Sequence, residues 1–503
     1  MNTEKFEAFA SDIALNLVGK LPTLQLPGAG NPIGEFAAEL GGIIKDENIF
    51  ERGGLPFTLS MDGRKLEPVS PAWLRTWIEQ HVQLYKPKIG AQGITNLPST
   101  MTDDTARALC KSPQFLRRLQ HVERINPCPM PWLRENGKID LLPVGMDTAS
   151  ATFTVDPGFE IETMPLDIAR SVLNHFLEEF AWPADKGRSM AVQIGAMLTV
   201  FASGIMPAGS IRPIFIFLAN AEGPGKTLLA QLCCSPYPDN ALEPAPSEKA
   251  EWAKRFLAAV IDGSRVLFFD NVKSHLNEGA LEAYVTASHY TGRILGISKS
   301  FTGEAGATVL ITGNQLTVSP DLRRRSLFVE LFLRELRAED RTFKRPLDPG
   351  IISSNRHNIL PALWTLVHEW NKAGRPQAST VNANFPQWSK TIGGIVEFAG
   401  YGCPLATPDI GGMGDTDTAD FATLAGNMEA GKLYPFDDIV RMADGVELFD
   451  RILGQKDSEG LTRSAKSTFA LLLGRFNGRS VTEAAIFRVE GKGHARRYVL
   501  ASC

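Results

Sequence analysis

The sequence predicts a protein of the α/β class whose central domain contains a parallel β-sheet. Three short apolar runs lie in the middle of the chain, at residues 214–218 (IFIFL), 265–269 (RVLFF) and 308–312 (TVLIT). Segments with helical periodicity separate them. Strands of a parallel sheet are covered by crossover helices on both faces, so they read as continuous apolar runs. The three runs and their spacing therefore predict such a sheet.

Composition limits the classes of function. The chain has 503 residues, of which 44% are hydrophobic and 21% charged, which is typical of globular domains and excludes disorder or a fibrous fold for most of its length. The net charge of −4 means that any nucleic-acid surface is a local basic patch. Six cysteines without a CxxC spacing exclude a disulfide framework or zinc ribbon. Without a signal peptide or an apolar run of about 20 residues, we expect a soluble, cytoplasmic protein.

Changes in pattern along the chain predict four units. Residues 1–160 form an α+β domain with an interaction or DNA-collar role, with helices at 71–82 and 102–109 and short strands around the turn Asn136–Gly137. Residues 161–345 form the core that contains the three apolar runs, and residues 346–402 form a helical unit that follows it. A Pro/Gly-rich linker at about 402–417 leads to a unit at 418–503.

A glycine-rich loop follows the first apolar run, in the sequence NAEGPGKT at residues 220–227, and an apolar helix comes next. Such a turn at a helix N-terminus directs backbone N–H groups at phosphates. Lys226 is expected to reach the β- and γ-phosphates, and the Thr227 hydroxyl to bind Mg²⁺. Asn220 stands where the motif normally has its first glycine, and it tolerates left-handed backbone better than most residues. The predicted ATP-binding residues are Asn220, Gly223, Gly225, Lys226, Thr227 and Leu228.

The second apolar run ends in Asp270–Asn271. A carboxylate at the end of a buried strand beside a phosphate loop is the expected position of a Mg²⁺ ligand, so Asp270 and Thr227 are the predicted metal-binding residues. Asn271 occupies the place where an acid often activates water. The general base therefore stays unassigned, with Glu278 and Glu282 downstream as candidates.

Two further groups complete the predicted catalytic set. The third run leads into Asn314, whose side chain is suited to orient the attacking water. Residues 321–325 (DLRRR) follow, and arginine offers a fixed fork of donors for phosphoryl charge in the transition state. We predict that Arg324 or Arg325 acts as an arginine finger in the site of a neighbouring subunit, which implies a ring. The alternative is a solvated basic patch.

The C-terminal unit is locally basic. Residues 463–503 contain eight Lys or Arg and two acids, and they predict an amphipathic helix followed by a hairpin around residues 490–494. Helices followed by a basic hairpin are typical of a winged helix, which contacts duplex DNA through a helix and the wing. The candidate contacts are Arg475, Arg479, Lys492, Arg496 and Arg497.

The ordered set GPGKT, FFDN, TGN and LRRR resembles the AAA+ ATPases, and more narrowly the superfamily 3-type replicative helicases and primase-helicases of phages, plasmids and other mobile elements. The resemblance implies a P-loop core with a helical lid, ATP and Mg²⁺ as cofactors, and a hexameric ring of identical subunits. It also implies a channel hairpin at residues 292–301 that grips single-stranded DNA, with Lys299 at its tip and Phe301 as a stacking residue. Arg356 matches a sensor of the γ-phosphate.

The predicted function is therefore an ATP-driven DNA helicase or translocase that acts in the replication of a mobile element. Expected partners are single- and double-stranded DNA, further copies of the chain, and a separate primase or other replication protein, but no membrane. Asn271 leaves open an origin-binding initiator or scaffold that uses ATP as an assembly switch without unwinding. A AAA+ protein remodeller is disfavoured, because it would leave the basic unit and the hairpin without a role.

Overall fold

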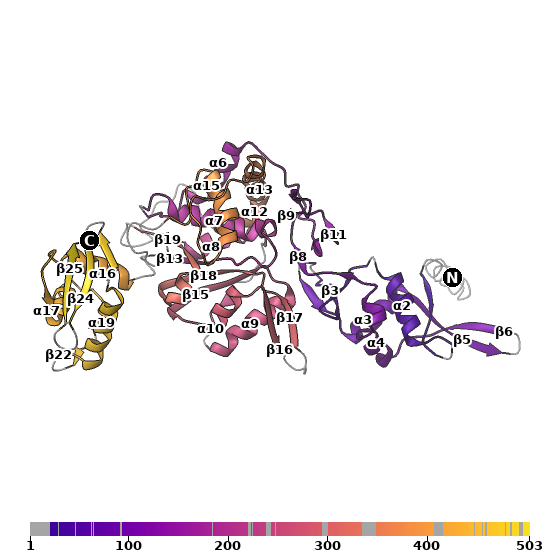
Figure 1. Cartoon of the computed structure of the whole chain (residues 1–503). Helices are drawn as coiled ribbons and strands as arrows, with labels where there is room; N and C mark the ends of the chain where they lie inside the picture. Colours follow the sequence, from indigo (N-terminus) through magenta and orange to yellow (C-terminus); the bar gives the residue numbers. More distant parts are fainter. Residues whose placement is uncertain are drawn as a thin grey trace, which may run out of the picture.

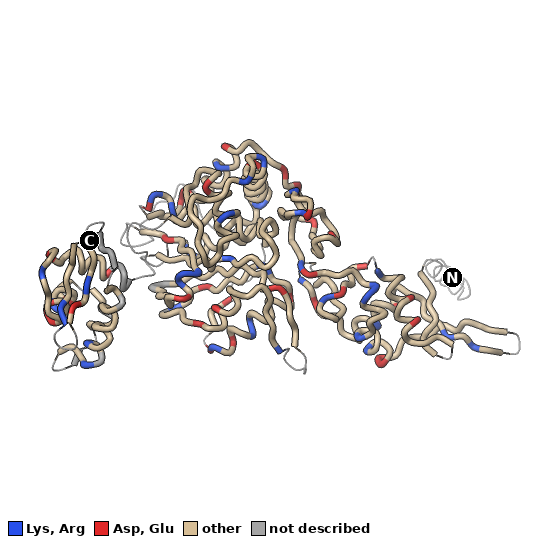
Figure 2. The backbone as a smooth tube through the Cα atoms, viewed as in Figure 1, with Lys and Arg blue, Asp and Glu red and all other residues tan. Residues whose placement is uncertain are grey.

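The computed structural model comprises an N-terminal module, a central α/β domain and a C-terminal module (Figure 1). It describes residues 21–28, 30–45, 47–61, 63, 65–90, 93–183, 185–219, 223, 225–237, 243–246, 248–293, 300–333, 349–406, 416–446, 448–454, 456–457, 460–477, 479–482, 485–491 and 496–502. Lys and Arg are interspersed with Asp and Glu over the central domain (Figure 2). The mixed α/β class predicted from sequence is confirmed.

The N-terminal module combines short strands with small helices around two apolar cores. Its helices are α2 (Ile33–Ile43), α3 (Pro71–His81), α4 (Asp103–Leu109) and α5 (Pro113–Leu116). Its strands are β1 (Thr23–Gln25), β2 (Ile49–Arg52), β3 (Leu55–Leu59), β4 (Leu66–Pro68), β5 (Gln83–Gly90), β6 (Gly93–Pro98), β7 (Gln120–His121), β8 (Arg124–Asn126), β9 (Pro131–Leu133), β10 (Ile139–Leu141), β11 (Gly145–Asp147) and β12 (Thr152–Thr154).

Local signals account for the predicted elements of this module. Helix α3 begins at Pro71, and the Ser70 hydroxyl accepts a hydrogen bond from the Trp73 backbone N–H at 3.2 Å. Helix α4 has Thr102 as its N-cap and two acids in its first turn, as the helix dipole favours. Strands β9 and β10 pair across a turn in which Gly137 has φ +81°. These three predictions are confirmed.

The central domain is built on a five-stranded sheet in the order β14-β15-β18-β13-β19, and every neighbouring pair is parallel. The strands are β13 (Ile214–Ala219), β14 (Glu243–Pro244), β15 (Val266–Leu276), β18 (Thr308–Val318) and β19 (Ser326–Leu331). Alternate residues face opposite sides: Phe215 and Phe217 join one core, whereas Ile214 and Ile216 join the other. Burial on both faces explains why the sequence shows continuous apolar runs.

Helices cover both faces of this sheet (Figure 1). One face packs against α6 (Leu166–Leu177), α7 (Arg188–Ala202), α13 (Arg356–Lys372) and α15 (Gly394–Phe398), and the other against α9 (Lys249–Asp262) and α10 (Gly279–Thr286). The remaining elements are η1 (Ser203–Ile205), α8 (Lys226–Cys233), β16 (His289–Arg293), β17 (Ser300–Glu304), α11 (Pro320–Arg323), α12 (Pro349–Ser354), α14 (Pro386–Trp388) and η3 (Ser389–Gly393). Helices from the predicted lid thus share one core with α6 and α7.

Residues 188–205 form the one described segment that is long and apolar enough to cross a membrane, and 78% of it is buried. The segment comprises α7 and the turn after it. Thirteen of the fifteen residues of α7 are buried, and nine of them belong to the core on the first face of the sheet. Its apolar character is therefore explained by packing between the sheet and α13.

The C-terminal module has a core of its own. A four-stranded sheet in the order β20-β25-β24-β23 packs against helices, and β24 and β25 form the hairpin expected from sequence. The elements are α16 (Thr416–Gly426), β20 (Tyr434–Pro435), α17 (Phe436–Asp444), α18 (Asp450–Leu453), β21 (Lys456–Asp457), β22 (Gly460–Leu461), α19 (Arg463–Arg475), β23 (Arg479–Thr482), β24 (Ala485–Glu490) and β25 (Arg497–Ser502).

Candidate functional site

The loop between β13 and α8 ends in glycines with left-handed backbone. Gly223 has φ +77°, and Gly225, the N-cap of α8, has φ +94°. A Cβ on Gly225 would lie 3.1 Å from the Phe180 ring, so both conformation and space require glycine there. Lys226 opens the helix with only 9% of its surface exposed, and Leu228 packs against the core. Asn220 lies outside the described residues.

Three side chains from three elements meet beside this helix. The Thr227 hydroxyl, on α8, donates a hydrogen bond to Asp270 Oδ1 on β15 at 2.9 Å. The Thr312 hydroxyl, on β18, donates to the same oxygen at 2.5 Å. Asp270 is thus held between the helix that starts at the glycine loop and the strand next to its own. The structure brings together Thr227 and Asp270, as the sequence predicts.

A bulge in β15 positions Asp270. The register between β15 and β18 shifts between Phe269 and Val272, and Asn271 has φ +54°. Asn adopts left-handed backbone more readily than most residues. The Asn271 backbone N–H donates to the Thr312 hydroxyl at 2.9 Å, which fixes the bulge to β18. Both strands continue beyond this point, to Leu276 and Val318, so Asp270 and Asn314 do not terminate their strands as expected from sequence.

Thr312 is the residue that sequence reasoning missed. It ends the run TVLIT and is 1% exposed, so it reads as one more strand residue. A buried hydroxyl needs a hydrogen-bond partner. A polar side chain at the end of a strand that is buried on both faces therefore indicates a hydrogen bond to a neighbouring element, and this signal is present in the sequence. Its partners make it a positioning residue for Asp270.

The oxygen atoms at this position suit Mg²⁺. This ion takes oxygen ligands, usually one or two carboxylates completed by water and phosphate oxygens. Thr227 and Asp270 supply one hydroxyl and one carboxylate, and their oxygens lie 2.9 Å apart. In an octahedral Mg²⁺ site, each ligand atom lies about 2.0–2.1 Å from the ion, so adjacent ligand atoms are about 2.9 Å from each other. The donor set and its spacing fit the predicted metal.

Helix α8 is fixed from two sides. From α7, the fully buried Gln193 donates through Nε2 to the Leu229 carbonyl at 3.0 Å. At the C-terminal end, Arg356 donates to the carbonyls of Ser235 and Pro236 at 2.8 and 3.1 Å. Arg356 therefore stabilises the end of α8 that is remote from the glycine loop, roughly 12 Å along the helix. The assignment of Arg356 as a γ-phosphate sensor is wrong for this conformation.

The other predicted groups near Asp270 are only partly defined. The backbone of Asn314 pairs with Lys273 in the strand register, but its side chain lies outside the described residues. The Asn271 side chain is exposed. Glu282 accepts a hydrogen bond from the Ser319 hydroxyl at 3.4 Å, and Glu278 is the N-cap residue of α10. No general base is assigned among them.

The arginines of the DLRRR segment lie at the opposite edge of the sheet. Ile214 N–H, at the start of β13, donates to the Arg325 carbonyl at 2.9 Å, and Ser326 pairs with Ile214. The glycine loop follows the other end of β13, roughly 17 Å away at about 3.3 Å per residue. Arg324 forms an ion pair with Asp321 and is 58% exposed, and Arg325 Nη1 donates to the Asp321 carbonyl at 3.1 Å. Neither arginine is placed to serve the phosphate loop of its own chain.

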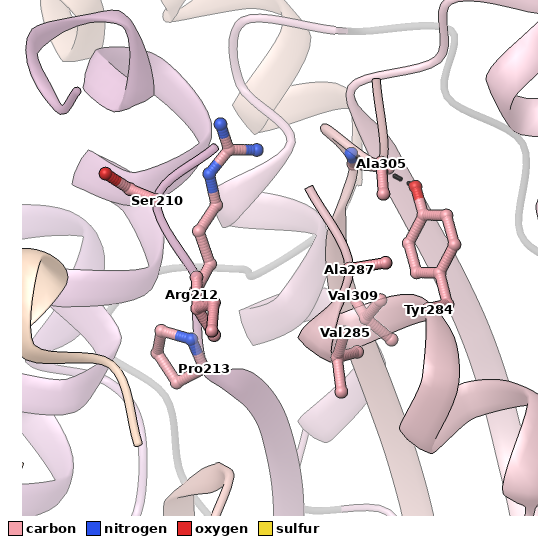
Figure 3. A pocket seen from close by; sticks show the side chains of 10 residues that line it. Ser210, Arg212, Pro213, Tyr284, Val285, Ala287, Ala305 and Val309 are labelled. Carbon is pink, nitrogen blue, oxygen red and sulfur yellow. Dashed lines mark hydrogen bonds between the residues drawn. The ribbon is translucent and has the colours of Figure 1, made fainter. Parts of the chain in front are cut away.

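A pocket at this second edge is distinct from the candidate site. Arg212, Tyr284 and Val309 are among its lining residues, together with several alanines, and none of the residues from the glycine loop lines it (Figure 3). The Tyr284 hydroxyl accepts a hydrogen bond from the Ala307 backbone N–H at 3.2 Å. The charge of Glu304 acts on Arg212 of this pocket. Glu304 itself forms ion pairs with Arg124 at 2.8 Å and Arg265 at 3.2 Å.

The predicted hairpin between the second and third runs is confirmed, as β16 pairs with β17. Its tip, with Lys299, lies outside the described residues. Phe301 is 5% exposed and packs on Gly53, and the Arg52 guanidinium lies 5.6 Å from its ring. The assignment of Phe301 as a DNA-stacking residue is wrong, because the ring is a core residue where the N-terminal module meets the hairpin.

The candidate DNA contacts of the C-terminal module are described in part. Arg496 and Arg497 are half-buried at the start of β25. Arg475 ends α19 and Arg479 begins β23, but their side chains, like all of Lys492, lie outside the described residues. Arg463 and Lys466 are exposed on α19 together with Leu471, of which 69% is exposed.

No protein-family model matches the sequence, and no curated protein matches it. Among solved structures, the chain is similar to the A form apo structure of the NrS-1 C-terminal region, with 13% identity over 86% of this chain and 100% of that chain and a TM-score of 0.32. It is also similar to a structure described as SCCmec type IV Cch, active helicase, with 10% identity over 88% of this chain and 82% of that chain and a TM-score of 0.34. At these values the functional assignment rests on the site's own geometry.

Proposed function

We propose that the chain is an ATPase that binds nucleotide between the glycine loop and Asp270. The observation that carries this is the contact of Thr227, in the first turn of α8, with Asp270 on β15, beside two left-handed glycines. Backbone N–H groups at the start of α8 would bind the phosphates, and Lys226 would neutralise their charge. Thr227 and Asp270 would hold Mg²⁺, which when bound lowers the negative charge on the phosphates.

The proposed site is completed by a second copy of the chain. Arg324 and Arg325 lie at the far edge of the sheet, at the opposite end of β13 from their own glycine loop. We assign the finger to Arg324, because its side chain is the more exposed of the two. A neighbour's guanidinium would stabilise charge on the γ-phosphoryl group, and Asn314 would orient the attacking water. Head-to-tail contacts of this kind form a closed ring when the rotation between neighbouring copies closes on itself, and we propose that it does here.

The ATPase would drive movement on DNA. The β16–β17 hairpin and the basic C-terminal module are the elements proposed to contact single- and double-stranded DNA, with Lys299 at the hairpin tip. In this proposal the protein is a ring-forming helicase or translocase in the replication of a mobile element. The competing function is an ATP-gated initiator without unwinding, favoured by the exposed Asn271 where an acid would activate water.

The experiment is ATP hydrolysis by the full chain with and without single-stranded DNA, together with its mass in solution. The proposal predicts turnover that DNA stimulates at least several-fold, in a species of about six subunits. Lys226→Ala should abolish turnover, whereas Lys254→Ala, which removes an exposed lysine on α9, should not. Nucleotide binding without turnover would favour the initiator, and turnover by Lys226→Ala would refute the site.

A further inference from the structure

Strands β5 and β6 form an arm that projects from the N-terminal module (Figure 1). The two strands pair from Tyr85 opposite Pro98 to Gly90 opposite Gly93. The third strand of the sheet, β1, pairs only with Gln83 to Tyr85. Beyond Tyr85 the arm is a two-stranded ribbon, and it continues for roughly 15 Å at about 3.3 Å per residue.

The two faces of the arm differ in chemistry. Side chains alternate along a strand, so Tyr85, Pro87 and Ile89 share a face with their cross-strand partners Pro98, Asn96 and Ile94. The other face carries Lys86 and Lys88, with Thr95 and Leu97 as their cross-strand partners. Residues 83–98 contain no Asp or Glu, and Figure 2 shows blue but no red along the arm.

The end of the arm exposes a pair of large apolar side chains. Ile89 and Ile94 are direct cross-strand neighbours, with 83% and 71% of their surfaces exposed. A two-stranded hairpin alone is only marginally stable in water, and an exposed cross-strand pair of isoleucines stabilises it only slightly. Such a projecting pair is expected where another molecule covers it.

We propose that this arm enters a groove of duplex DNA. The major groove is about 12 Å wide and 8.5 Å deep and admits a two-stranded β-ribbon, so a projection of roughly 15 Å reaches its floor. Lys86 and Lys88 contact phosphates from one face of the ribbon, and Ile89 and Ile94 contact the base edges at its end. DNA-binding ribbons and arms use apolar side chains in the grooves in this way.

Charge selects DNA over a second copy of the chain as the occupant. The arm is basic without any acid, although the whole chain carries a net charge of −4. Two lysines on one face of an acid-free ribbon complement a phosphate backbone and would repel the identical face of another copy. The inference goes beyond the proposed function, because it assigns duplex binding to the N-terminal module and requires no nucleotide.

The test is equilibrium binding of the full chain to a fluorescent duplex, without nucleotide, at salt concentrations from 50 to 200 mM. Lys86→Gln with Lys88→Gln should reduce the slope of log K against log salt by about 1.8, because each phosphate contact contributes about 0.9. Wild-type affinity should thus fall roughly tenfold more than that of the variant over this range. Lys45→Gln with Lys111→Gln, which changes two exposed lysines of the same module outside the arm, is the matched control.

A second variant tests the apolar end. Ile89→Ser with Ile94→Ser should weaken duplex binding several-fold at every salt concentration without changing the slope. Unchanged melting temperatures would show that both pairs of substitutions leave the fold intact. An unaltered slope for the lysine variant would overturn the proposal. The proposal would also be overturned if either variant had a lower mass in solution than wild type but bound duplex equally well, because the arm would then be a contact between subunits.

Discussion

The two edges of the central sheet carry different kinds of polar chemistry. At the carboxyl edge, beside the glycine loop, the Thr227 and Thr312 hydroxyls both donate to Asp270 Oδ1, at 2.9 and 2.5 Å. At the amino edge, Arg324 forms an ion pair with Asp321 and is mostly exposed, and the Arg325 side chain donates to the Asp321 carbonyl. The first edge holds a closely connected set of polar side chains, and the second holds a pair of cations that directly follow the short helix α11.

The separation of these edges is the reason why the proposed function needs a second copy of the chain. Parallel strands send all their carboxyl ends to one side, so residues before β19 and residues after β13 cannot meet. A catalytic guanidinium must contact the phosphoryl group directly, and roughly 17 Å of strand intervenes. In the proposed function the arginine therefore comes from another copy.

The largest effect should come from the amino edge. Arg324→Ala combined with Arg325→Ala should reduce ATP hydrolysis by about a thousandfold, as expected for loss of an arginine finger. Binding of a fluorescent nucleotide should stay within about threefold, since the carboxyl edge is unchanged. Arg323→Ala is the control, because this guanidinium lies 5.4 Å from the Phe328 ring and packs within the chain. A loss from Arg323→Ala as large as that of the double variant would contradict the separation of roles.

Asp270→Asn should lower hydrolysis by about a hundredfold. The amide keeps the size of the side chain and an acceptor for Thr227, but it removes the charge that suits Mg²⁺. The apparent Mg²⁺ affinity, measured by titrating the metal at fixed nucleotide, should fall as well. Normal metal dependence with reduced turnover would place Asp270 outside the metal site.

A smaller effect should follow Thr312→Val, about tenfold in hydrolysis. The substitution keeps the shape but leaves Asp270 without one donor and the Asn271 N–H without its acceptor, at a cost of about 1–3 kcal/mol. Thr312→Ser should restore activity, because it retains the hydroxyl. If serine fails while valine is active, packing rather than hydrogen bonding determines the role of Thr312.

Glu304→Gln should leave hydrolysis nearly unchanged but destabilise the domain. Burial acts to raise the pKa of Glu304, yet the charges of Arg265, Arg124 and Arg212 outweigh it and lower the pKa to about 2. The contribution to stability, on the order of 3 kcal/mol, is thus present above the ordinary value of about 4.5 and is lost as pH falls towards 2. Melting temperatures between pH 5 and pH 2 should show this loss in wild type and not in the variant.

Sequence patterns predict the sheet because burial on both faces leaves continuous apolar runs. They also predict Lys226, Thr227 and Asp270 as candidate site residues, because these polar residues come soon after the apolar runs in the sequence. Phe301 and Arg356 were assigned wrongly, since each is used by an element distant in sequence: Gly53 and Arg52 cover the ring, and the end of α8 binds the guanidinium. Thr312 was missed because its partners are set by a bulge, which depends on strand register.

The most direct test of the account mixes two inactive variants. Lys226→Ala removes the phosphate lysine at the carboxyl edge, and Arg324→Ala with Arg325→Ala removes the cations at the amino edge. If the site is shared between subunits, mixed assemblies contain some interfaces with both groups intact, and ATP hydrolysis reappears. At a 1:1 ratio and with independent interfaces, about a quarter of the interfaces have both groups, so the rate should be about a quarter of that of wild type. No recovery in assemblies shown by mass to contain both variants would contradict the shared site.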